Sequence, residues 1–140
     1  MEHTQNIQNW ANGVISHWIS NKIKVQIGAT LTEIHKTEGV IGIRFPESFV
    51  ALYTVANGFT DWDMNKNMIS IWPLQRIEEE YAINRDKNFV GFCDYLINSH
   101  SIGFLKNSPG IFKEYDEFNP IAATFEEGVE LINGDSDLIY

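Results

Sequence analysis

Apolar residues recur at helical spacing near the start of the chain. Polar residues such as Asn9 and Ser16 alternate with a stripe made of Ile7, Trp10, Ala11, Val14, Ile15, Trp18 and Ile19. The internal glycine, Gly13, weakens a helix by about 1 kcal/mol relative to alanine, which a periodic stripe of this length outweighs. The pattern predicts an N-terminal amphipathic helix within residues 1–25 that turns its apolar side toward the core.

Capping signals predict two more helices in the first half of the chain. Thr30 and Glu33 have the spacing of a capping box, so a short helix should follow and end near one of the glycines at 39 and 42. Pro46 suits the first turn of the next helix, where its missing N–H costs nothing. Asn57-Gly58 is expected to stop that helix, with the glycine in the left-handed conformation.

Short apolar runs in the second half predict strands. They cover residues 68–72, 89–93, 102–105, 111–112 and 121–122. A turn is expected at Ser108-Pro109-Gly110, and a brief helix at 74–81. Thr124 and Glu127 repeat the capping-box spacing before a last helix that ends at Gly134.

The order of these elements indicates the fold class. Helices, then strands, then a final helix favour α+β structure over alternating βαβ units. We predict a single domain over residues 1–140, in which a twisted antiparallel sheet of about four to six strands is flanked by helices.

Charge narrows the range of partners. The formal net charge is −9, with 19 Asp and Glu residues against 10 Lys and Arg. That sign argues against nucleic acid and against an anionic membrane as partners. It fits a basic protein partner, although solubility alone would also account for it. The start of the chain lacks signal-peptide features and no apolar run could span a membrane, so we expect a cytoplasmic protein.

Candidate catalytic and metal-binding groups are sparse. The single cysteine, Cys93, follows an apolar run and is expected in the core rather than as a nucleophile. Asp61, Asp63 and Asn65 have the spacing of the first three ligands of a calcium loop, but Lys66 stands where that loop requires glycine. We therefore predict no bound metal.

Signals for catalysis are equally weak. Ser99-His100 sets a hydroxyl beside an imidazole, but adjacent residues rarely point at each other and no nucleophile-elbow pattern surrounds them. No phosphate-binding glycine loop occurs, and the histidines form no metal-ligand spacing. We therefore predict that the protein is not an enzyme and has no cofactor. The alternative is a hydrolase or a small-ligand binder, because the sequence does not give the distances between its many carboxylates, which such a site depends on.

Several segments, taken in order, resemble the SUKH superfamily. It includes the fungal regulator of cell-wall glucan synthesis and many bacterial immunity proteins. The segments are Phe45-Pro46-Glu47-Ser48-Phe49, Leu52-Tyr53 with Asn57-Gly58-Phe59, Ile69-Ser70-Ile71-Trp72-Pro73-Leu74, Phe89 to Tyr95, and Ile121 to Glu127. They look like the family's proline-initiated helix with an Asn-Gly stop, its strand into a Pro-Leu turn, its apolar strand ending in Asp, and its small-residue strand before a Phe-Glu-Glu helix. The resemblance covers roughly residues 30–135, and an acidic residue ahead of the first of these segments, Glu38, also fits.

The resemblance implies an α+β domain that binds a protein and has neither catalysis nor a cofactor. Many bacterial members look like cytoplasmic antidotes that bind and block toxins, often nucleases, delivered between neighbouring cells. Nuclease surfaces are usually basic, so an acidic antidote would be electrostatically matched to a basic toxin domain. A regulatory adaptor like the fungal member is the alternative.

For such a partner we predict contacts from aromatic anchors flanked by carboxylates in loops. The predicted contact residues are Asp61, Trp62, Asp63, Asp94, Tyr95, Asp116 and Glu117. The alternative is that Trp62 and Tyr95 simply cover the sheet.

Overall fold

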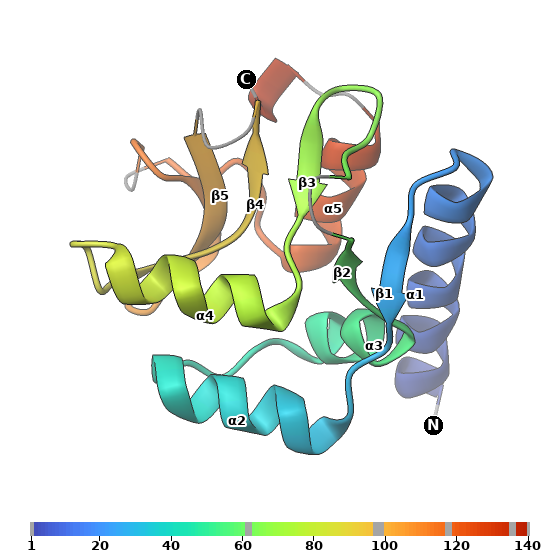
Figure 1. The fold of residues 1–140 in the computed structure, drawn as a ribbon, viewed down its shortest axis with the longest axis horizontal. Helices are drawn as coiled ribbons and strands as arrows, with labels where there is room; N and C mark the ends of the chain where they lie inside the picture. The colour runs from blue at the N-terminus through green and yellow to red at the C-terminus, as the bar shows by residue number, and fades with distance from the viewer. Residues whose placement is uncertain (1, 61–62, 97–99, 117–118, 135–136, 140) are drawn as a thin grey trace.

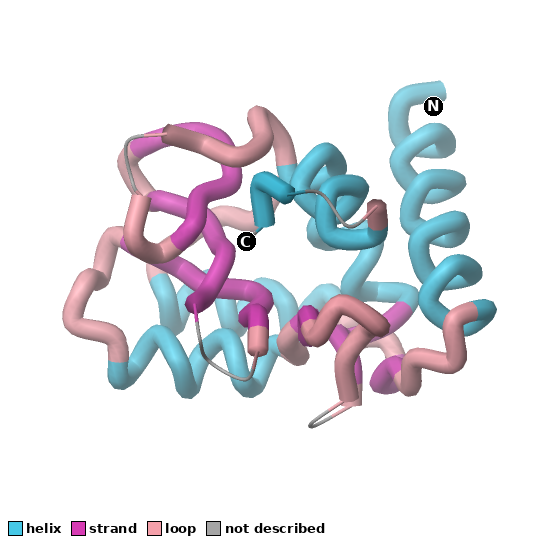
Figure 2. The backbone as a smooth tube through the Cα atoms, turned by 90° about the horizontal axis from the view of Figure 1, so that it is seen from above, coloured by secondary structure: helices cyan, strands magenta, loops and turns pink. Residues whose placement is uncertain are grey.

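The computed structural model describes residues 2–60, 63–96, 100–116, 119–134 and 137–139 (Figure 1). The helices are α1 (Glu2–Ser20), α2 (Leu31–Ile41), α3 (Glu47–Val55), α4 (Leu74–Ile83), α5 (Phe125–Asn133) and the 3-10 helix η1 (Asp137–Ile139). The strands are β1 (Val25–Ile27), β2 (Ala56–Phe59), β3 (Ile69–Ile71), β4 (Phe89–Tyr95), β5 (His100–Leu105) and β6 (Ser108–Lys113). Seen from above in Figure 2, α1 runs along one side of the molecule and the strands of the second half gather on the other.

The described strands form two antiparallel sheets. β1 pairs with β2, while β3, β4, β5 and β6 form a four-stranded meander in chain order. Within the meander Ile69 lies opposite Tyr95, and Tyr95 lies opposite His100, so these residues form a row across one end of the sheet. The predicted α+β class is confirmed, with the strands divided between two sheets.

The predicted start and end of α2 are confirmed. The Thr30 hydroxyl accepts a hydrogen bond from the Glu33 amide (3.1 Å), and the Glu33 carboxylate accepts one from the Thr30 amide (3.0 Å). The helix ends at Gly42, which has a φ of 83°. This left-handed conformation costs glycine little because it has no Cβ.

At α5 half of the predicted capping box forms. Thr124 Oγ accepts from the Glu127 amide (3.2 Å), as expected. The Glu127 carboxylate instead accepts from the Ala123 amide (3.1 Å), one residue before the position that a capping box uses. Both bonds still satisfy amides that the first turn of a helix leaves free.

Asn57-Gly58 does more than end a helix. The helix α3 stops at Val55, and both residues belong to β2, which the sequence did not predict. Gly58 has the expected positive φ, 71°. β1 and β2 have three and four residues, which is too short to give a recognisable alternation.

The hairpin between β5 and β6 turns earlier than predicted. The turn lies at Lys106-Asn107, and Ser108-Pro109-Gly110 begins β6. Proline is acceptable there because β6 is an outer strand of the meander, and the backbone bonds to the 121–122 segment on its outer side are made by Ile111.

Helix α1 is part of the core. Trp18 is 1% exposed, its indole donates to Asn133 Oδ1 of α5 at 2.8 Å, and its ring meets Phe59 edge-on at 4.9 Å. Ile19, predicted on the apolar stripe, is instead 59% exposed, because it lies at the edge of the stripe near the end of the helix. No helix of the described chain is long and apolar enough to cross a membrane.

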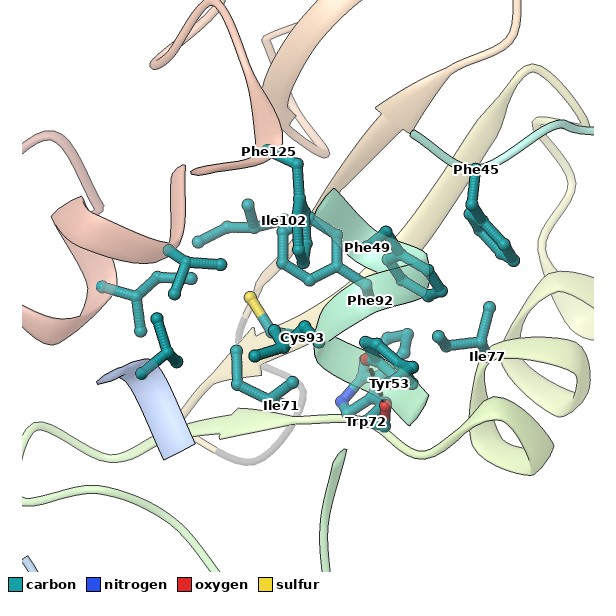
Figure 3. Packing of buried hydrophobic residues seen from close by; sticks show 14 of the residues in the cluster. Phe45, Phe49, Tyr53, Ile71, Trp72, Ile77, Phe92, Cys93, Ile102 and Phe125 are labelled. Atoms are coloured by element: carbon teal, nitrogen blue, oxygen red, sulfur yellow. Dashed lines mark hydrogen bonds between the residues drawn. The ribbon is translucent and has the colours of Figure 1, made fainter. Parts of the chain in front are cut away.

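Aromatic rings connect the helices to the sheet (Figure 3). Phe45 stacks on Phe49 at 3.9 Å, and Phe49 stacks on Tyr53 at 4.0 Å. Phe125 of α5 then reaches both Phe49 (5.3 Å) and Phe92 of β4 (5.1 Å). Such ring pairs add about 0.5–1.5 kcal/mol each beyond the area they bury, so they fix the helices against one face of the sheet.

Candidate protein-binding surface

Three of the segments that carry the family resemblance meet around Trp72: those with Tyr53 and Gly58, with Trp72 itself, and with Phe92 and Asp94. This residue is 1% exposed, and its indole nitrogen donates to Asp94 Oδ1 at 2.8 Å. Its carbonyl accepts from the Tyr53 hydroxyl at 2.6 Å, and its amide donates to the Phe92 carbonyl at 2.8 Å. The side chain and both backbone groups of Trp72 are therefore satisfied, as buried polar groups need to be.

The Asn-Gly pair has a structural reason at the same place. A Cβ on Gly58 would lie 2.5 Å from the Trp72 carbonyl carbon and from Pro73 N, so only glycine allows the two backbones this close. Asn57 Oδ1 accepts from the Leu74 amide at 2.9 Å. Asn57 thereby supplies, from β2, the cap that Pro73 cannot give to α4.

Asp94 lies inside β4 and not in a loop as predicted. It is 2% exposed, and its second carboxylate oxygen faces Arg76 Nη2 at 3.2 Å. The Arg76 guanidinium also covers the Trp72 ring, 4.7 Å from its centroid. A carboxylate buried in this way holds the fold together, and we leave Asp94 out of the contact surface proposed below.

The two candidate catalytic side chains, Cys93 and His100, are respectively buried as a thiol and hydrogen-bonded to a backbone carbonyl. Cys93 is fully buried, and burial, with a smaller effect of Asp94, raises the pKa of its thiol well above the usual value. His100 donates from Nε2 to the Ile139 carbonyl at 2.8 Å. Ser99, which precedes it in the sequence, lies outside the described residues. Within the described ranges no three His, Cys, Asp or Glu side chains come together in a way that could hold a metal ion.

The structure separates the predicted contact residues. Asp61, Trp62 and Glu117 lie outside the described residues. Asp63 accepts hydrogen bonds from the backbone amides of Lys24 (2.5 Å) and Met64 (3.0 Å), which ties its loop to the start of β1.

Tyr95 and Asp116, in contrast, lie at one end of the meander. Tyr95 is half-buried, with its ring 5.2 Å from that of His100. Asp116 follows β6. The Glu114 amide, between β6 and Asp116, donates to the Ser101 carbonyl of β5 at 2.9 Å. The ends of β4 and β6 and the start of β5 therefore bring these residues to the same rim of the sheet.

A tight turn at this rim exposes an aromatic side chain that sequence reasoning missed. The Asp116 amide donates to the Lys113 carbonyl at 2.9 Å, which leaves Glu114 and Tyr115 at the tip. Tyr115 is 79% exposed. The signal was present in the sequence, because Tyr115 stands between two carboxylates just after an apolar strand ends. It is the kind of anchor sought at Trp62 and Tyr95.

A small groove lies beside the turn, between α4 and the sheet. The α4 side contributes Glu80, Tyr81 and Ile83, and the sheet side contributes Gly91 and Glu114, with the Trp72 ring also lining it. Its volume is about 200 Å³. Small-molecule sites usually measure about 300–1,000 Å³, so this groove suits a single side chain of a partner. The two glutamates in its lining favour a positively charged one.

The negative charge of the chain is concentrated in the last quarter of the sequence, which includes this turn. Residues 107–140 contain eight carboxylates and one lysine, a net charge of −7 out of −9 for the whole chain. Three of these carboxylates, Glu126, Glu127 and Glu130, lie on α5, which packs on β6 through Gly128 and Ile111. Glu114 and Asp116, on either side of Tyr115, therefore belong to the most acidic segment of the chain.

The fold defines an α+β domain with two antiparallel sheets. The model of the SMI1 / KNR4 family (SUKH-1) matches residues 28–130, which is most of the chain. The protein therefore belongs to the SMI1 / KNR4 family, as the resemblance indicated. None of the curated proteins matches the chain. Helix α1 precedes the matched range, although its Trp18 is part of the same core.

Proposed function

We propose that this protein is a non-catalytic immunity protein that binds a basic toxin domain and blocks its active surface. The observation that carries the proposal is the position of Tyr115, 79% exposed, at the tip of a turn and between the carboxylates of Glu114 and Asp116. Interface hot spots are enriched in tyrosine, and complementary charge accelerates association.

Each part of the surface has a distinct role in binding. The net charge of −7 over residues 107–140 steers a basic partner to the turn. Tyr115 supplies the apolar anchor, and the groove between Glu80 and Glu114 receives a lysine or arginine side chain. Neutralisation follows because the bound domain covers the positive surface with which a nuclease holds its substrate.

The first experiment is co-expression with toxin domains encoded beside this protein, followed by affinity capture. We expect growth protection and a stable complex whose association slows as salt is raised. Absence of protection together with absence of a complex would refute the proposal. Capture of a cellular protein in place of any toxin would favour the regulatory adaptor.

Matched variants locate the surface. Tyr115→Ala should weaken binding by at least about 2 kcal/mol, roughly thirtyfold, without changing stability. The control is Ile27→Ala, because Ile27 is 93% exposed but lies on β1, away from the meander.

A second pair separates local from overall charge. Glu114→Lys and Glu79→Lys change the net charge equally, but Glu114 lines the groove and Glu79 does not. We expect a larger loss of affinity for Glu114→Lys. Equal losses would show that the groove has no specific role.

A further inference from the structure

A larger pocket lies at the opposite end of the meander from Tyr115. Its walls are the α2–α3 connection, the β5–β6 hairpin and the first turns of α3 and α5, and its volume is about 680 Å³. The apolar part of the lining includes Phe104, Ile111 and Phe125. This volume lies within the usual range of ligand sites, about 300–1,000 Å³.

One wall of the pocket is held in place by Lys106. Its Nζ donates to the Ile41 carbonyl at the end of α2 (2.6 Å) and to the Tyr81 hydroxyl (2.5 Å). The ammonium group also lies 4.6 Å from the centre of the Tyr81 ring. The hairpin turn is therefore fixed against α2 and α4, and the cavity is built into the fold.

A serine at the start of α3, Ser48, lines this pocket. Ser48 is 2% exposed, lines the cavity, and makes no side-chain hydrogen bond with the described residues. The Ser48 oxygen is not among the fully buried polar atoms without a partner in the described chain, so it is accessible from the cavity, where a ligand or water can bond to it.

The start of α3 beside Ser48 also favours a negative charge. Pro46 gives α3 no side-chain cap, and the first bond within the helix is from the Val50 amide to the Pro46 carbonyl (3.1 Å). Amides before that bond have no partner inside the helix, and a helix start of this kind attracts negative charge.

The charge of the lining contrasts with that of the protein. Arg44 and Lys106 are positive and Glu126 is negative, which leaves the lining at +1 in a chain of net charge −9. Arg44 is exposed on the connection between α2 and α3, so its guanidinium is available to a ligand at the mouth. Guanidinium groups bind carboxylates through two parallel hydrogen bonds.

We infer that this pocket binds a carboxylate attached to an apolar group. The carboxylate lies on the Ser48 hydroxyl and the start of α3, with Arg44 above it, and the apolar group lies against Phe104 and Phe125. Two sources share this chemistry, namely the C-terminus of a peptide that ends in an apolar residue and a small apolar carboxylic acid. This site is independent of the acidic surface proposed for the toxin.

The test is titration of the full chain, followed by backbone amide shifts in NMR spectra. The probes are hexanoate and hexanamide, and the peptide acetyl-Ala-Leu-Phe as free acid and as C-terminal amide. We expect the acids to shift the amides of Ser48 and Phe49 and to bind at least about tenfold more tightly than the amides, the effect of one charge-assisted hydrogen bond. Tighter binding of the free-acid peptide than of hexanoate assigns the peptide source, and equal or weaker binding assigns the small acid.

Two variants test the residues, each with a matched control elsewhere on the surface. Arg44→Gln and Ser48→Ala should each weaken binding of the acids about tenfold, whereas Arg85→Gln and Ser16→Ala should leave it unchanged. Arg44 is exposed, so its variant remains informative even if Ser48→Ala unfolds the protein. The inference is overturned by equal binding of acids and amides, by unchanged affinity in Arg44→Gln, or by no shifts at about 10 mM probe, well above a millimolar Kd.

Discussion

Replacement of Asp94 by alanine tests whether the Trp72 arrangement holds the fold together. The change leaves the Trp72 indole N–H, buried at 1% exposure, without its acceptor at 2.8 Å. An unsatisfied buried donor costs about 1–3 kcal/mol. Arg76 also loses its partner, but its side chain is 19% exposed and Glu80 lies 3.8 Å away, so we add at most about 1 kcal/mol. The expected loss is about 2–4 kcal/mol of unfolding free energy.

Asparagine at the same position separates the two contributions. Asp94→Asn keeps an oxygen for the Trp72 indole but turns an amide N–H₂ toward the Arg76 guanidinium, where two donors face each other. We expect a loss of about 1–2 kcal/mol, between wild type and Asp94→Ala.

The assay is urea unfolding, followed by tryptophan fluorescence and circular dichroism, with linear extrapolation to water. Glu79→Ala, an exposed substitution on α4, is the control and should stay within about 0.5 kcal/mol of wild type. The reasoning is refuted if Asp94→Ala also stays within that limit. It is equally refuted if Asp94→Asn is as costly as Asp94→Ala, because the indole would then not be the main loss.

Three further substitutions probe local structure. Gly58→Ala should lower the free energy of unfolding, measured with urea, by more than about 2 kcal/mol, because its Cβ would lie 2.5 Å from backbone atoms. A Cβ on Gly13 would have nothing within 4 Å, so Gly13→Ala should stabilise α1 by about 0.5–1 kcal/mol. A Gly13→Ala variant that is less stable than wild type would contradict this. Thr124→Ala should lower the free energy of unfolding by about 1 kcal/mol through loss of the α5 cap, and an unchanged urea midpoint would disprove that role. The Thr30 amide and then its hydroxyl lower the pKa of Glu33, so this carboxylate favours folding at neutral pH and that effect disappears as the pH falls through the lowered pKa. A carboxyl NMR titration should show the low pKa of Glu33 and a partial rise toward the usual value in Thr30→Ala, and a pKa that does not respond to this substitution would exclude the hydroxyl as a cause.

The helices were predictable because their signals are local. The Thr30–Glu33 capping box and Gly42 determine both ends of α2 within the segment itself, and Thr124 and Gly134 bound α5 in the same way. A helix closes its own hydrogen bonds, so its limits can be read without knowledge of its neighbours.

The ordered motifs also indicated the family, but not the role of their residues. Asn57 reads as a helix stop in the sequence, whereas its side chain caps α4 from another strand. Asp94 reads as a loop carboxylate that could meet a partner, whereas the structure buries it against Trp72 and Arg76. Both bonds join residues at least 17 positions apart, a separation that no local pattern reports.

The sequence by itself determined the limits of α2 and α5, the α+β class, the sign of the charge and the family to which the chain belongs. Tertiary structure alone decided that Asp94 is buried, that Tyr115 stands out at a turn, and that Ser48 lines a cavity beside Arg44. The physical reason is that capping and hydrophobic periodicity act between near neighbours in the chain. Burial and the pairing of polar groups depend on which distant segments come into contact when the core forms.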